Sequence, residues 1–200
     1  MVNCIEQDSL KVRRSIYGLG KLSHSADVCL EDSIKSCILH CPTPFNVQSA
    51  RVVILFNEHH QLLWDKIWNN LKKLIPASAQ KNTQQKIASF AKANGTILYF
   101  EDKHSLTELK KQFPIYAKNM KTWVQQANGM LQFMVWQVLA ENNIGASLQH
   151  YNEIIEKDLF SMYDIPKNWE LIAQMPFGSI EKEPLEKTFL PLKNRIKVLK

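Results

Sequence analysis

The 200-residue sequence lacks the features that define several specialised protein classes. Four cysteines at irregular spacing are too few for a disulfide framework, and we expect them to be reduced. Six glycines and eight prolines exclude collagen-like and low-complexity chains. No apolar run approaches the ~20 residues of a membrane span, and the N-terminal residues lack the apolar stretch of a secretory signal. We therefore expect a cytoplasmic protein with no membrane partner.

The common motifs of enzyme active sites are also missing. Gly18-Leu19-Gly20-Lys21 resembles a phosphate-binding loop, but Ser15 and Leu22 stand where the Walker pattern requires glycine and Ser or Thr. Ser23 occupies the third glycine position of the dinucleotide fingerprint, so we expect only a flexible turn here. The six histidines form no HExxH motif, and no GxSxG is present. The sequence therefore predicts neither a metal site nor a catalytic nucleophile.

The charge of the chain is basic but dispersed. With 25 Lys and Arg against 19 Asp and Glu, the net charge is +6, which favours anionic partners such as nucleic acid, anionic membranes or phosphorylated cofactors. The densest basic stretch, residues 193–200, alternates with apolar residues. Aromatic residues do not interleave with basic ones as on a nucleic-acid platform. We expect no nucleic-acid partner, and a basic nucleic-acid-binding protein remains a weaker alternative.

Hydrophobic periodicity predicts a mixture of helices and strands without strict βαβ alternation, which indicates the α+β class. The helix over residues 123–141 should be central, because apolar residues cover more than half of its circumference. The β-branched run over residues 51–56 predicts a strand buried on both faces. We expect a small central sheet flanked by helices in one domain spanning residues 1–200. The other predicted helices cover 3–11, 30–41, 59–75, 80–93, 106–113 and 153–163, and the other predicted strands cover 96–100 and 169–175.

Residues 179–200 contain two prolines and no clear amphipathic period. They predict an extended C-terminal arm, ended by a short strand over residues 196–199. An arm that carries apolar residues without a partner in its own hairpin often packs on another subunit.

Three groups of polar residues remain, and each has an ordinary explanation when taken alone. Arginines at a helix end complement the helix dipole, loop amides cap turns, and C-terminal basic residues are often solvated. The groups are Arg13, Arg14 and Ser15; Asn46 and Gln48; and Lys193 and Arg195.

Five segments in order resemble the nitroreductase family of FMN flavoproteins. More narrowly, the sequence resembles the short subgroup that includes bacterial nitroreductases of about this length and fungal fatty-acid-repression-type proteins. The segments are Arg13-Arg14-Ser15-Ile16-Tyr17, Pro44-Phe45-Asn46-Val47-Gln48-Ser49-Ala50-Arg51-Val52, Asn128-Gly129-Met130-Leu131-Gln132-Phe133, Gly145-Ala146-Ser147-Leu148-Gln149-His150-Tyr151-Asn152 and Gln174-Met175-Pro176-Phe177-Gly178.

The resemblance implies a homodimer that holds two FMN molecules in its interface and exchanges its C-terminal arms. It also implies a ping-pong reaction, in which NADH or NADPH reduces the flavin and a nitroaromatic or quinone acceptor reoxidises it. Hydride passes through flavin N5, so no catalytic side chain is expected from the protein.

The same resemblance implies a role for each site residue. Arg13, Arg14 and Arg195, together with Lys193, suit the FMN phosphate, because a dianion needs converging cations. Ser15 can donate to ribityl or pyrimidine oxygens, and Tyr17 stands where many family members carry Arg or Lys.

Neutral side chains account for the rest of the implied site. Asn46 matches the asparagine that reaches the cofactor from the other subunit, with Gln48 as its support. Pro44 and Phe45 would form an apolar wall beside the flavin ring. The residues near flavin N5, where the family commonly has a Glu-Gly pair, are here Leu148, Gln149 and His150.

Two kinds of function fit this reading. The leading one is an FMN-dependent NAD(P)H oxidoreductase that reduces nitro compounds or quinones. The alternative is a flavin-binding redox sensor or regulator whose turnover is slow and incidental. Steady-state turnover with NADH and a nitroaromatic separates the two, because a sensor would be reduced once and stop.

Overall fold

The computed structural model describes the backbone of residues 8–200 and the side chains of residues 10–23 and 30–200. The predicted helix over residues 3–11 lies partly outside this range, and its described part is α1 (Asp8–Val12). At the centre is an antiparallel sheet in the order β1 (Gly18–Gly20), β5 (Trp169–Lys182), β3 (Gly95–Asp102) and β2 (Ala50–Phe56). The short β4 (Gly145–Ala146) also pairs with β5.

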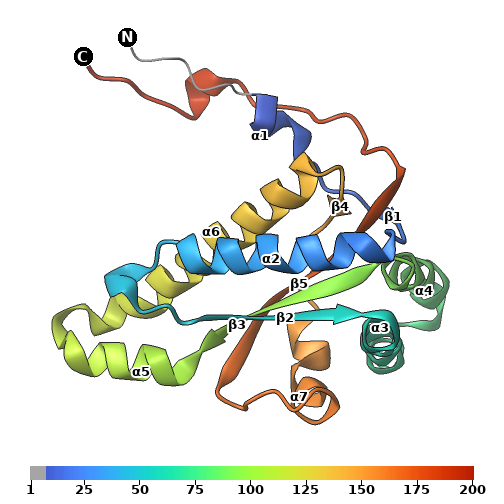
Figure 1. Ribbon diagram of the computed structural model, residues 1–200, viewed down its shortest axis with the longest axis horizontal. Helices are drawn as coiled ribbons and strands as arrows, with labels where there is room; N and C mark the ends of the chain where they lie inside the picture. The colour runs from blue at the N-terminus through green and yellow to red at the C-terminus, as the bar shows by residue number, and fades with distance from the viewer. Residues whose placement is uncertain (1–7) are drawn as a thin grey trace.

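Helices cover both faces of this sheet (Figure 1). The helices α2 (His24–His40) and α6 (Ala117–Glu141) pack on one face, and α3 (Asn57–Leu71), α4 (Ala77–Ala91) and α7 (Asn152–Met162) pack on the other. All of β3 is buried, and its side chains point alternately into the two hydrophobic cores, one on each face of the sheet. Ile97 and Tyr99 join the α2–α6 core, whereas Leu98 and Phe100 join the opposite one. The α+β class with a long central helix is thus confirmed.

A smaller cluster closes the end of the molecule beside the start of α6. It is formed by α5 (Lys103–Gln112), the 3-10 turns η1 (Pro44–Asn46) and η2 (Pro114–Tyr116), and the first turns of α6. Leu106 and Leu109 of α5 pack there against Met120 and Val124 of α6. This cluster supports the loop that contains Asn46 and Gln48.

Residues 18–20 form β1, so the expected flexible turn was wrong. Leu19 is buried, and the strand pairs with the far end of β5. Glycine is needed here for close approach of two backbones, because a Cβ built on Gly178 would lie 2.0 Å from the carbonyl oxygen of Gly20.

The predicted strand over residues 51–56 is present and both of its faces pack on a core, with Val52 on the α2–α6 side and Val53 on the other, but it lies at the edge of the sheet and is only partly buried. β2 pairs only with β3 in the described sheet, and Leu55 is its one buried residue. The β-branched run indicated a strand correctly but could not show that one edge lacks a neighbour.

The third predicted strand is longer than expected. β5 continues through Pro176 to Lys182, because Pro176 still accepts a hydrogen bond from the backbone N–H of Ser147 (3.3 Å). The arm therefore begins at residue 183. Its predicted final strand over residues 196–199 is not formed, because these residues have no pairing strand; only the 3-10 turn η3 (Leu192–Asn194) interrupts the arm. Within the described part of the chain, none of the helices combines the length and apolar character that a bilayer crossing demands.

Candidate functional site

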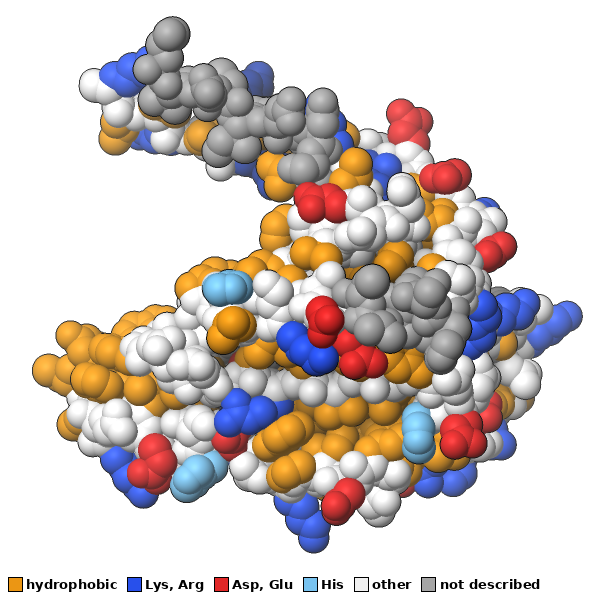
Figure 2. Space-filling model, viewed as in Figure 1, with side chains coloured by type: hydrophobic (Ala, Val, Ile, Leu, Met, Phe, Trp, Pro, Cys, Tyr) orange, Lys and Arg blue, Asp and Glu red, His pale blue; other side chains and the backbone are white. Residues whose placement is uncertain are grey.

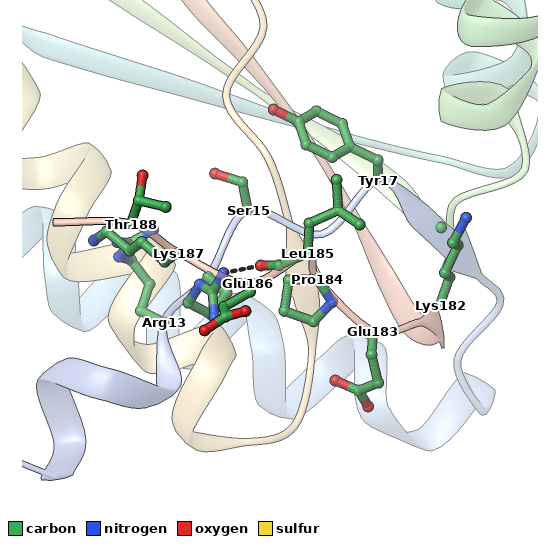
Figure 3. Close-up of a pocket in the computed structure, with 12 residues that line it drawn as sticks. Arg13, Ser15, Tyr17, Lys182, Glu183, Pro184, Leu185, Glu186, Lys187 and Thr188 are labelled. Carbon is green, nitrogen blue, oxygen red and sulfur yellow. Dashed lines mark hydrogen bonds between the residues drawn. The ribbon is translucent and has the colours of Figure 1, made fainter.

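A cavity of about 560 Å³ lies between the segment that follows α1 and the first residues of the C-terminal arm (Figure 3). Four predicted site residues meet there, namely Arg13, Arg14, Ser15 and Tyr17. The opposite wall is formed by residues 182–188, which the sequence did not indicate. Four basic and two acidic side chains line the cavity, so the net positive charge of its lining favours an anionic ligand.

The two arginines are held from different sides. The guanidinium of Arg13 lies 4.5 Å from the ring centroid of Trp136 on α6, within cation–π distance. Arg14 donates a hydrogen bond to the carbonyl oxygen of Leu185 on the arm, dashed in Figure 3. Trp136 was missed from the sequence, because an aromatic residue on this apolar helix has the pattern of a core residue.

Backbone pairing brings a second predicted group next to the first. Ser15 bridges Ala146, and the N–H of Ile16 donates to the Ala146 carbonyl oxygen at 2.9 Å. The chain continues from Ala146 directly into residues 148–150. Gln149 is buried and exchanges two backbone hydrogen bonds with Gln174 (2.7 and 2.9 Å), whereas Leu148 is half-buried and His150 is exposed. These two groups, more than 130 residues apart in sequence, are therefore neighbours in one chain.

The third predicted group lies on the loop around η1 and does not line this cavity. Its backbone is unusual, because Phe45, Asn46 and Gln48 have φ angles of 51°, 54° and 49°. Such left-handed conformations cost non-glycine residues about 1–3 kcal/mol each. Pro44 begins η1, and the ring of Phe45 stacks on Phe113 with centroids 4.2 Å apart.

Lys193 and Arg195 are also absent from the cavity wall. They lie in and just after η3, where both are exposed. Within a single chain, the segment with Arg13, Arg14, Ser15 and Tyr17 thus lies beside residues 148–150. The η1 loop and the end of the arm lie elsewhere.

A buried polar network stands behind the η1 loop and was also missed. Ser49 donates to Glu101 at 2.6 Å, and Asn128 donates to the other oxygen of Glu101 at 2.8 Å. Burial raises the pKa of Glu101, although these two hydrogen bonds oppose the shift. Beside it, Arg51 pairs with Asp102 at 2.9 Å. The sequence did not indicate that Glu101 and Asp102 are buried, because they come at the end of an apolar strand, where charged residues usually mark the start of an exposed loop.

Comparison with known proteins identifies the class. The nitroreductase family model matches residues 10–179. The chain is 31% identical over 193 residues to the HBN1 protein of Saccharomyces cerevisiae, covering 95% of this chain and 94% of that protein. It is 30% identical over 181 residues to the nitroreductase FRM2 of the same yeast, covering 89% of each.

A solved structure agrees. Nitroreductase CinD from Lactococcus lactis in complex with chloramphenicol superposes with a TM-score of 0.88 at 36% identity, covering 96% of this chain and 98% of that one. Both the fold and the sequence therefore match those of nitroreductases, which are α+β oxidoreductases. The chain belongs to the nitroreductase family, which confirms the resemblance drawn from its five segments.

Proposed function

We propose that this protein is an FMN-dependent NAD(P)H nitroreductase. In the proposed ping-pong cycle, NADH or NADPH is the electron donor and a nitroaromatic or quinone is the acceptor. Bound FMN supplies the hydride chemistry at its N5 atom. The observation that carries the proposal is the cavity that gathers Arg13, Arg14 and Ser15 against the C-terminal arm.

The cavity residues fit FMN in charge and in size. Arg13 and Arg14 present planar guanidinium groups, which bind a phosphate dianion with two hydrogen bonds each when aligned. The hydroxyl of Ser15 is placed on the same wall as a neutral donor. The cavity volume of about 560 Å³ lies within the range of cofactor pockets.

We further propose a cytoplasmic homodimer of single-domain chains, in which each flavin is held by both protomers. The η1 loop and residues 193–195 lie away from the cavity of their own chain, so a second copy is needed to complete the implied residue set. On α6, Met130 and Phe133 are each 45% exposed, and a Cβ built on Gly129 meets no atom within 4 Å. An apolar, open helix face of this kind is suited to packing against another copy.

Nitro compounds are the proposed acceptors. CinD has been solved in complex with chloramphenicol and with 4-nitrophenol, and this chain is 36% identical to it. The exposed face of Phe45, which stacks on Phe113, offers an aromatic surface to such a ring.

The test is a visible absorbance spectrum of the purified, desalted protein. We expect flavin bands that bleach with NADH or NADPH and return when 4-nitrophenol or a quinone is added. A colourless protein that takes up no added FMN would overturn the proposal. Sustained turnover with both substrates distinguishes an enzyme from a redox sensor, which would be reduced once and then stop.

A further inference from the structure

The η1 loop (residues 43–48) holds a backbone conformation that is unfavourable for several of its residues. Phe45, Asn46 and Gln48 lie in the left-handed region without being glycine. Strain of this kind persists only where surrounding contacts over-determine the conformation. Side chains that contact the loop must therefore hold it in this conformation.

Arg51, at the start of β2, contacts the loop and the sheet at the same time. Its Nη1 donates to the carbonyl oxygens of Gln48 (2.7 Å) and Ala50 (3.0 Å), and its Nη2 donates to Oδ2 of Asp102 (2.9 Å). The planar guanidinium can satisfy both sides because its donors point in fixed, different directions. Arg51 thus ties the end of the loop to the end of β3.

Asp102 is itself fixed in place. Its Oδ1 accepts from the N–H of His104 (2.9 Å) and from the side chain of Asn168 (2.6 Å), and its Oδ2 accepts from Ser105 (2.7 Å). Its own backbone N–H donates to the carbonyl oxygen of Ser49 at 3.0 Å. A carboxylate with these partners cannot follow the loop if the loop moves, so it acts as an anchor.

Phe45 and Val47 also pack on the cluster formed by α5, η2 and the start of α6, but the loop's other hydrogen bonds do not replace the Arg51 anchor. The N–H of Gln48 donates to Oγ1 of Thr43 at 3.1 Å, and its side chain donates to the carbonyl oxygen of Asn46 at 3.4 Å. Both of these bonds lie within the loop and would move with it. The bond from Ser49 to Glu101 joins the loop's end to β3, but it reaches no residue before position 49.

We propose that Arg51 and Asp102 are positioning residues of the flavin site, which hold residues 44–48 in the conformation that presents Asn46 and Gln48 to the flavin. This inference rests on the proposed function, because FMN is the ligand to which the loop is presented. Neither residue needs to touch the cofactor. Their effect passes through the carbonyl oxygen of Gln48.

The direct test is hydrogen exchange of the loop amides in flavin-free protein. The reporters are the N–H groups of Asn46, Val47 and Gln48, each of which donates a hydrogen bond within the loop. We expect Arg51→Ala to speed their exchange by about tenfold, as the loss of a charge-assisted anchor implies. Lys66→Ala is the matched control, because it removes a 2.9 Å ion pair with Asp158 away from the loop. Exchange at the wild-type rate in Arg51→Ala would overturn the proposal.

The second test is the dissociation constant for FMN, measured by the quenching of flavin fluorescence. We expect affinity to fall about tenfold in Arg51→Ala and in Asp102→Ala, with little further loss in the double variant, because the pair acts as one unit. Arg51→Lys should fall between these and the wild type, since one ammonium cannot span the carbonyl and the carboxylate as a guanidinium does. This milder change also decides the matter if Arg51→Ala does not fold.

The outcomes separate the two proposals. Faster exchange with an unchanged FMN dissociation constant, or an equal loss of affinity in Lys66→Ala, would show a merely structural role and overturn the inference. A wild-type protein that takes up no FMN overturns the proposed function, and it does so before any variant is compared.

Discussion

His60 is a fully buried histidine held in one tautomer by its neighbours. Its Nε2 lies 3.1 Å from the carbonyl oxygen of Ala91, which can only accept, so Nε2 carries the proton. Its Nδ1 then accepts from the hydroxyl of Thr96 at 2.9 Å, while that hydroxyl accepts from the indole N–H of Trp64. A second proton, on Nδ1, would require the Thr96 hydroxyl to rotate and give up the hydrogen bond that it donates to the ring. Burial lowers the pKa of His60 to about 4.

This lowered pKa makes stability fall on acidification. In the unfolded chain the histidine takes up a proton near pH 6.5, whereas in the fold it stays neutral to about 4. The contribution is complete above pH 6.5 and is lost as the pH falls toward 4, to a total of about 3 kcal/mol. Urea unfolding from about pH 7 to about pH 5 should show about half of this loss. His60→Gln should flatten the slope over that range, and an unchanged slope in the variant would contradict the assignment.

Glu101 is a buried hydrogen-bond acceptor, and we expect its negative charge to add nothing to the stability of the fold. Because burial raises its pKa, the folded state favours the protonated acid, and the carboxyl weakens the fold as the pH rises through the raised value. Glu101→Gln keeps an acceptor for Asn128 and can donate to the Ser49 oxygen. We expect its free energy of unfolding at neutral pH to equal or exceed that of the wild type in urea titrations.

Glu101→Ala supplies the contrast. It leaves the buried Ser49 hydroxyl without its acceptor, which costs about 1–3 kcal/mol. The Asn128 amide loses one of two acceptors and keeps its bond to the Phe100 carbonyl oxygen (3.1 Å). If Glu101→Gln proved as destabilising as Glu101→Ala, the negative charge itself would be required.

At the scale of elements, the pairing of β1 with β5 depends on glycine, and most strictly on Gly178. A methyl group at Gly178 would overlap the Gly20 carbonyl oxygen at 2.0 Å and approach the Asn94 backbone nitrogen at 3.0 Å, and neither backbone can yield cheaply. We expect Gly178→Ala to lower the free energy of unfolding by about 3 kcal/mol and to loosen the segment around Ser15. Asn82→Ala is the control, because Asn82 is exposed within α4 and alanine there should raise helix stability by less than about 1 kcal/mol. The melting temperatures of the two variants test this prediction, and equal values would contradict the close packing at Gly178.

The strongly patterned elements were predictable from sequence, and the weakly patterned ones were not. β3 and α6 were placed correctly, because long apolar runs and helical periodicity report burial directly. β1 has three residues, two of them glycine, so it carries no periodic signal. The end of β5 was missed because Pro176 and Gly178 are typical of turns, whereas here the proline carbonyl still accepts a bond and the glycine permits close approach.

The candidate site was also predictable only in part, because a single sequence reports motif order and periodicity but not contacts between distant elements. Motif order indicated Arg13 and Ser15 together with residues 148–150, and the bridge from Ser15 to Ala146 brings them side by side. The support of Arg13 by Trp136, and of the η1 loop by Arg51, depends on contacts between distant elements. Such contacts leave no spacing pattern in one sequence.

At the scale of the whole molecule, the chain presents a large apolar surface along its arm. Figure 2 shows the molecule hollowed between the arm and the α6 side of the body. On the arm, Leu185, Phe189 and Leu190 are 84%, 74% and 73% exposed. Isolated exposed apolar residues are ordinary, but several along one extended segment are typical of a surface that another chain covers. This supports the proposed exchange of arms between two protomers.

A shared site of this kind makes a specific prediction for mixed dimers. If Arg13 of one protomer and Asn46 of the other serve the same flavin, then Arg13→Ala and Asn46→Ala should each weaken FMN binding at both sites of their own homodimers. In a heterodimer of the two variants, one site carries both changes and the other carries neither. Co-expression with two different affinity tags, followed by flavin titration of the doubly purified species, should therefore recover wild-type affinity at half of the sites. Two weak sites in the heterodimer would instead mean that Arg13 and Asn46 of the same chain act together, and the shared site would be wrong.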